Sequence, residues 1–169
     1  MRKRIAIVLA ALCITVALLS PVSIKASGAE IPSKETFVIV NGEQKQVKVI
    51  HVFDDGSQLL EGQPTVITQT RSSKTGQKPY YHCNSSGTVL WTATVIGTFT
   101  YNGSTSYCTN ASYETQVSGS TWSEQSGSAY PSGNSAIADV VMIRKLLFVV
   151  LETVPVTITL TCDKNGNLS

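Results

Sequence analysis

The chain has 169 residues, of which 13 are lysine or arginine and 11 are aspartate or glutamate. Four basic residues and no acidic residue lie within the first 29 positions, so a product without them has 140 residues and a net charge of −2. A mildly acidic product has no charge-based reason to bind nucleic acid or anionic lipid. Its length suits one domain with a real core. The sequence shows no catalytic, metal-spacing or nucleotide-binding motif, so we expect neither an enzyme nor a cofactor.

The N-terminus has the composition of a secretory signal peptide. Arg2, Lys3 and Arg4 precede the 15-residue apolar run from Ile5 to Leu19. This run is shorter than the roughly 20 residues that span a bilayer, so we expect a cleaved signal peptide over residues 1–29. Cleavage after Ala26 and an uncleaved anchor stay open as alternatives. The product is expected outside the cell or at the cell surface, with no stable membrane span.

A small β segment is predicted for residues 30–70. Apolar and β-branched residues flank the turn pair Asn41-Gly42, which predicts a β-hairpin over 36–53. A turn and two short strands are expected to follow, at 54–56, 58–60 and 65–70. Residues 71–86 are rich in Ser, Lys, Gly and Gln, and we interpret them as a linker or long loop.

The clearest pattern in the chain lies at residues 88–101, where apolar and threonine positions alternate. The apolar parity holds Val89, Trp91, Ala93, Val95, Phe99 and Tyr101, and the other parity holds Thr92, Thr94, Thr98 and Thr100. A period of two places these sets on opposite faces of a sheet. The pattern predicts a long strand with one buried face and one solvated face.

The rest of residues 87–169 predicts further strands. We expect a turn at Asn102-Gly103, a return strand over 106–117 and a short strand around Trp122. The expected later elements are strands at 136–143 and 146–152 around Arg144-Lys145, a strand at 154–162 and a closing turn at 163–166. A helix over 136–152 is disfavoured because Val, Ile and Phe dominate it. The fold class is therefore all-β, an antiparallel sandwich over 87–169.

Three cysteines remain after cleavage, which allows three single pairings. Cys162 continues the inward row of the last strand, Cys108 lies in the return strand, and Cys83 lies in the expected linker. This placement favours a Cys108–Cys162 disulfide, which export permits. Two buried free thiols remain the alternative.

Two threonine rows are the candidate ligand surface. They consist of Thr92, Thr94, Thr98 and Thr100 in one strand and Thr157, Thr159 and Thr161 in another. A regular hydroxyl array can meet sugars, but Thr is also common on the solvent side of strands. Four tyrosines are candidates for stacking on a sugar or a partner, namely Tyr80, Tyr81, Tyr113 and Tyr130.

Other chemical sites are disfavoured. Cys83 beside His82, with His51 or Asp54 as helper, suggests a thiol nucleophile, but adjacent strand residues point to opposite faces. Asp54 and Asp55 are better explained as a turn than as cation ligands.

Together these segments resemble a family of small exported proteins of Gram-positive bacteria. The resemblance covers about residues 87–169 and rests on 90–94, 97–103, Cys108, Trp122, 132–134 and 159–166. It implies an immunoglobulin-like C-terminal domain of unassigned function, and it supports the Cys108–Cys162 pairing. No catalytic residue comes with it. The leading hypothesis is a secreted, non-enzymatic binding module for an unknown extracellular partner. The alternatives are a carbohydrate- or cell-wall-binding protein and, third, a thiol or hydrolytic enzyme.

Overall fold

The computed structural model describes residues 36–169, so the predicted signal peptide and its cleavage site lie outside the described residues. The described part is built entirely of antiparallel strands, which confirms the all-β prediction. The strands are β1 (Thr36–Val40), β2 (Glu43–Val52), β3 (Gln58–Gly62), β4 (Thr65–Gln69), β5 (Ser73–Cys83), β6 (Val89–Tyr101), β7 (Ser106–Val117), β8 (Trp122–Ser132), β9 (Ser135–Leu146) and β10 (Val149–Thr161).

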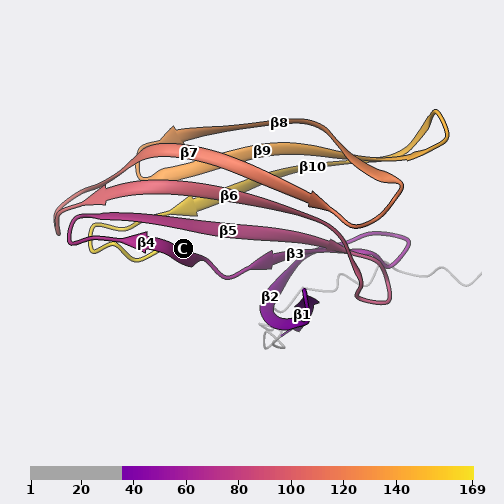
Figure 1. Cartoon of the computed structure of the whole chain (residues 1–169), viewed down its shortest axis with the longest axis horizontal. Coiled ribbons are helices and arrows are strands. Elements are labelled where there is room, and N and C mark those ends of the chain that lie inside the picture. Colours follow the sequence, from indigo (N-terminus) through magenta and orange to yellow (C-terminus); the bar gives the residue numbers. More distant parts are fainter. Residues whose placement is uncertain (1–35) are drawn as a thin grey trace, which may run out of the picture. The chain divides into compact units, whose positions relative to one another are not determined.

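The strands form two sheets (Figure 1). The large sheet has the order β1-β2-β3-β5-β6-β7, and β4 pairs with the N-terminal half of β5, beyond the end of β3. The small sheet has the order β10-β9-β8. Within residues 36–169 the strand order follows the chain order and lacks the Greek-key crossings of immunoglobulin domains. The two-sheet architecture is thus consistent with a β-sandwich, and the immunoglobulin-like assignment rests on the resemblance alone.

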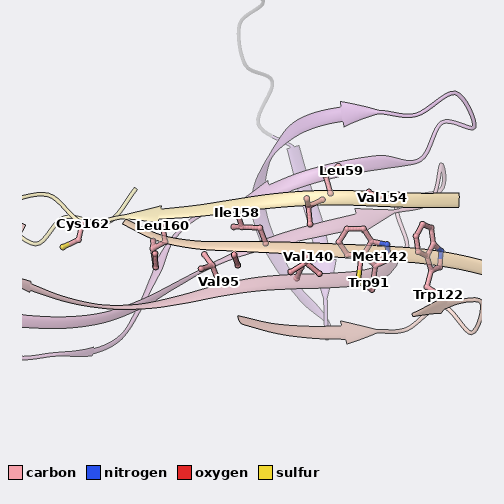
Figure 2. Close-up of a cluster of buried hydrophobic side chains, with 14 of the residues drawn as sticks. Leu59, Trp91, Val95, Trp122, Val140, Met142, Val154, Ile158, Leu160 and Cys162 are labelled. Carbon is pink, nitrogen blue, oxygen red and sulfur yellow. The ribbon is translucent and has the colours of Figure 1, made fainter. Parts of the chain in front are cut away.

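One hydrophobic core lies between the two sheets (Figure 2). The large sheet contributes mainly from β6, whose Trp91, Ala93, Val95 and Phe99 are fully buried. The small sheet contributes alternate residues of β9 and β10, including Ala136, Ala138, Val140, Met142, Val154, Val156, Ile158 and Leu160. The period-two prediction for 88–101 is confirmed for Trp91, Ala93, Val95 and Phe99, which all lie on one face of β6. It is wrong for Val89, which packs on the opposite face because the register shifts at a β-bulge there.

A second, smaller apolar cluster lies on the opposite face of the large sheet. It consists of Val38, Val47, Leu60, Tyr81 and Cys83. The β1–β2 hairpin supplies the first two of these residues, and its turn at Asn41-Gly42 has the positive φ angles that a two-residue hairpin needs. The predicted N-terminal hairpin is confirmed, and it covers one part of the outer face of the large sheet.

The prediction of a linker or long loop at 71–86 is wrong for residues 73–83, which form β5. This strand pairs with β6 along one edge and with β3 and β4 along the other. Its polar composition is tolerated because polar side chains find partners: the ammonium group of Lys74 is buried and donates to the carbonyl of Gly166. Residues 36–70 and 87–169 are therefore joined by a shared strand.

The predicted strand break at Arg144-Lys145 is also wrong. Both residues belong to β9, where Arg144 pairs with Glu152 and Lys145 pairs with Val150. The chain turns three residues later than Arg144, at Leu147-Phe148, and Val149 returns opposite Leu146. The Arg144 Nε atom lies 3.5 Å from the Glu152 carboxylate, so the charge is neutralised within the sheet. β8 is likewise longer than expected, with 11 residues starting at Trp122.

Candidate functional site

The two predicted threonine rows lie on different sides of the molecule. The inward rows of β6 and β10 meet in the same core, so the alternate rows of the two strands point in opposite directions. On β10, the Thr157 hydroxyl donates to Asp139 over 2.6 Å, and Thr161 shares a hydrogen bond of 3.1 Å with Ser135. The β10 row is therefore engaged with its own sheet, and the seven threonines do not form one array.

The β6 row runs beside a polar cleft on the outer face of the large sheet. The cleft has a volume of about 360 Å³ and is lined by Gln44, Lys45, Gln46, Gly62, Gln63, Thr65, Gln77, Pro79 and Tyr81. Across the β5–β6 ladder, Tyr81 is opposite Thr92 and Pro79 is opposite Thr94. Amide and hydroxyl groups dominate this lining, and Lys45 is paired with Glu43. The cleft and the β6 row together suit an uncharged, polar ligand.

The four candidate tyrosines do not gather into one aromatic surface. Tyr80 and Tyr113 pack against the core between the sheets, and Tyr81 belongs to the smaller cluster. The Tyr113 hydroxyl donates to Glu124 over 2.8 Å, which uses its polar end within the protein. Tyr130 is exposed on β8 of the small sheet. Of the four, Tyr81 alone borders the cleft.

Cys83 and His82 do not form a nucleophile and base pair, because they lie on opposite faces of β5. Cys83 is buried in the smaller cluster, and this burial raises the pKa of its thiol to about 11. A thiol in this setting is protonated and inaccessible, which is the reverse of what a nucleophilic cysteine needs. His82 points to the other face, among aromatic rings.

His82 lies at the centre of a buried aromatic cluster. Its ring stacks on Trp91, with ring centroids 5.1 Å apart and planes 3° from parallel, and it also contacts Trp122 and Phe53. Among the described residues, two buried ring nitrogens of this cluster have no hydrogen-bond partner, His82 Nδ1 and Trp91 Nε1. Burial lowers the pKa of His82 to about 4, although the nearby Asp55 carboxylate opposes this effect.

The Asp54-Asp55-Gly56 segment is a turn, as predicted. The Asp55 carboxylate accepts a 2.9 Å hydrogen bond from the Ser57 backbone N–H, and hydrogen bonding with Ser57 lowers the pKa of Asp55. Across residues 36–169, no group of three or more His, Cys, Asp or Glu side chains is arranged to hold a metal ion.

The three described cysteines are free thiols in this structure. Cys108 and Cys162 are nevertheless neighbours, because their backbone N–H groups donate to the consecutive carbonyls of Gly133 and Asn134, over 2.8 and 3.0 Å. Cys108 also packs against the core cluster that contains Cys162. Burial raises the pKa of the Cys108 thiol, and the proximity of Cys162 adds to this effect.

The most prominent exposed apolar surface was not anticipated from the sequence. It is the end of the β9–β10 hairpin, residues Leu146, Leu147, Phe148, Val149, Val150 and Leu151, which we call the apolar tip. All six side chains are exposed, with Leu147 at 86% and Phe148 at 99%. In Figure 1 this hairpin extends beyond the connection between β7 and β8. The apolar run at 146–151 is visible in the sequence. Such a run normally predicts a buried strand, so the sequence alone does not predict that these side chains are exposed.

Comparison with protein-family models, with curated proteins and with solved structures finds no match to this chain. In residues 36–169 there is also no helix long and apolar enough to cross a membrane. The candidate surfaces are therefore interpreted from their own geometry: the polar cleft with the β6 threonines, and the apolar tip.

His82 is expected to make the fold sensitive to acid. Below the ordinary pKa of 6.5 the unfolded chain binds a proton that folded His82 does not bind until about pH 4. The free energy of unfolding should therefore fall by up to about 1.4 kcal/mol per pH unit as the pH drops across this window. His82→Phe should reduce this slope in urea unfolding at a series of pH values. An unchanged slope in His82→Phe would contradict this explanation of the acid sensitivity.

Proposed function

We propose that this chain is a secreted, non-enzymatic binding module that acts outside the cell or at its surface. The observation that carries the proposal is the apolar tip, because six consecutive exposed apolar side chains are costly in water unless a partner covers them. Export is supported by the composition of residues 1–29. The proposal includes a β-sandwich, supported by two antiparallel sheets around one core. Its immunoglobulin-like character rests on the resemblance to small exported Gram-positive proteins alone.

Replacement of the tip should abolish binding to cell envelopes. In the variant Leu147→Asn with Phe148→Gly, Asn takes the positive φ of position 147, a backbone conformation that Asn41 also adopts. We expect co-sedimentation with Gram-positive envelopes to weaken by roughly tenfold or more, because the two most exposed apolar side chains are lost. Ile39→Asn removes an apolar side chain that is 69% exposed elsewhere and should bind like the wild type. Equal retention of all three proteins would argue against the tip as the binding element.

A carbohydrate- or cell-wall-binding function is the second candidate, favoured by the polar cleft beside the β6 threonines. Gln77 lines the cleft and is paired with Ile96, between Thr94 and Thr98 of that row. Gln77→Ala should reduce retention on peptidoglycan or polysaccharide columns several-fold, since an amide that recognises a hydroxyl is removed. Thr157→Ala, on the outer face of the other sheet, is the matched control. If the wild type is not retained on any of these columns, this second function is wrong.

We also propose that Cys108 and Cys162 form a disulfide in the exported protein. Their neighbouring positions beside Gly133 and Asn134 support this pairing. The thiols would each lose one hydrogen to an oxidised disulfide reagent or oxidoreductase, which is reduced to two thiols as the new S–S bond forms. In the chain-entropy description this crosslink stabilises the fold by roughly 4 kcal/mol.

The disulfide is tested by intact mass and thiol alkylation. The exported protein should be lighter by two hydrogen atoms before reduction than after it. Cys83→Ser should keep this difference, because Cys83 is buried in the other cluster, whereas Cys108→Ser should remove it. If the denatured, unreduced product alkylates at all three positions, the pairing does not form.

A further inference from the structure

The shape of the apolar tip constrains the kind of partner that fits it. β8 begins at Trp122, opposite Arg144, and the Lys145 N–H donates to the Thr121 carbonyl over 2.8 Å. Beyond this point the hairpin is a ribbon of two strands with no third strand beside it in the described chain. Leu147, the first residue of the turn, lies two residues beyond Lys145, which corresponds to a projection of roughly 7 Å. A convex, narrow and fully apolar projection fits a soft, penetrable surface.

The backbone of the tip limits how deeply it can enter an apolar layer. Leu146 pairs with Val149, so the ladder continues up to the turn; Leu147 and Phe148 form the turn, and Leu151 lies in a β-bulge without a partner in the register. Unpaired backbone N–H and C=O groups are very unfavourable in hydrocarbon, which tolerates a segment only when its backbone is hydrogen-bonded internally. The two outer edges of the ribbon have no third strand, so their N–H and C=O groups need water or lipid headgroups as partners, which limits insertion to the interfacial depth.

The conformation of the turn indicates that its apolar side chains are retained at a cost. Leu147 has a φ of 55°, in the left-handed region that a bulky side chain disfavours. Among residues 36–169 the other positive φ angles belong to six glycines and to Asn41, which are the residue types that tolerate this region. Asn or Gly at position 147 would relieve the strain and would also remove the exposed Leu. A strained, exposed Leu points to a function at this position.

The charges at the base of the tip are mixed. Lys145 is exposed directly below the apolar residues, whereas Arg144 is paired with Glu152. Asp55 lies near this pair and is acidic. The net field at the base is therefore weak, and insertion of apolar side chains, rather than attraction to anionic headgroups, is the expected driving force.

We propose that the apolar tip inserts into the surface of a lipid bilayer. Leu147 and Phe148 enter the upper acyl region, and Lys145 remains at the level of the headgroups. The projection of roughly 7 Å matches the depth at which interfacial apolar elements lie. This inference rests on the proposed function, because it names the partner of the same surface.

The test uses a tryptophan reporter at the tip of the full chain. Phe148→Trp should show blue-shifted emission with phosphatidylcholine vesicles, and lipids that carry a spin label on the acyl chain should quench it. Ile39→Trp is the matched control at an exposed apolar position on β1, and its emission should not change. The two variants differ only in the position of the added tryptophan. Emission from the buried Trp91 and Trp122 is therefore the same in both proteins. Any vesicle binding through residues 5–19 is also the same in both. Adding phosphatidylglycerol should raise binding only slightly, because one exposed lysine contributes.

The outcomes separate the inference from the function on which it rests. Unchanged emission of the Phe148→Trp variant with vesicles, together with retention on envelopes that depends on the tip, would overturn the lipid proposal and leave the binding module standing with a non-lipid partner. A blue shift that appears without vesicles and grows with protein concentration would overturn it too, by showing that a second copy of the chain covers the tip. If the wild-type protein binds neither vesicles nor envelopes, both the lipid proposal and the binding-module proposal are wrong.

Discussion

Burial of the inward row of β6 against the small sheet is the interaction on which the rest of the structure depends. Trp91, Val95 and Phe99 are fully buried, and alternate residues of β9 and β10 cover them. Burial of this much apolar surface is the main favourable term in folding. Because side chains alternate along a strand, burying one row of β6 presents its threonines on the outer face. The same rule on β10 sends the other threonine row to the opposite side of the molecule.

The two ends of β9 have different characters. At its N-terminal end, Gly133 and Asn134 of the preceding turn bind the backbones of Cys108 and Cys162, which places a half-buried thiol beside a buried one. At its other end, β9 passes the cluster of aromatic rings around His82 and continues into the apolar tip. At the N-terminal end of β9, oxidation of the two thiols would add stability. At the other end, the fold exposes apolar side chains.

The apolar tip reverses the usual relation between sequence and structure. Charged residues normally mark turns and apolar residues mark buried strands, yet here Arg144 and Lys145 lie in the ladder and Leu147-Phe148 makes the turn. The reason is pairing between strands: Arg144 faces Glu152 on β10 and Trp122 on β8, and both neighbours hold it in register. The register of β9 and β10 is set by their long inward rows, and it leaves the last apolar residues without a layer to cover them.

The sequence by itself determined the all-β class, the alternation in β6 and β10, and the turns at Asn41-Gly42, Asp54-Asp55-Gly56 and Asn102-Gly103, because period-two burial and left-handed turn residues are local properties. Only the tertiary structure decided that the polar segment 73–83 is β5, since its stability comes from neighbours on both edges rather than from its own composition. Three further features depend on which sheet covers which face. They are the separation of the threonine rows, the burial of Cys83 and His82 on opposite faces, and the exposure of the tip. No single segment specifies that packing, because it arises from contacts between residues far apart in the chain.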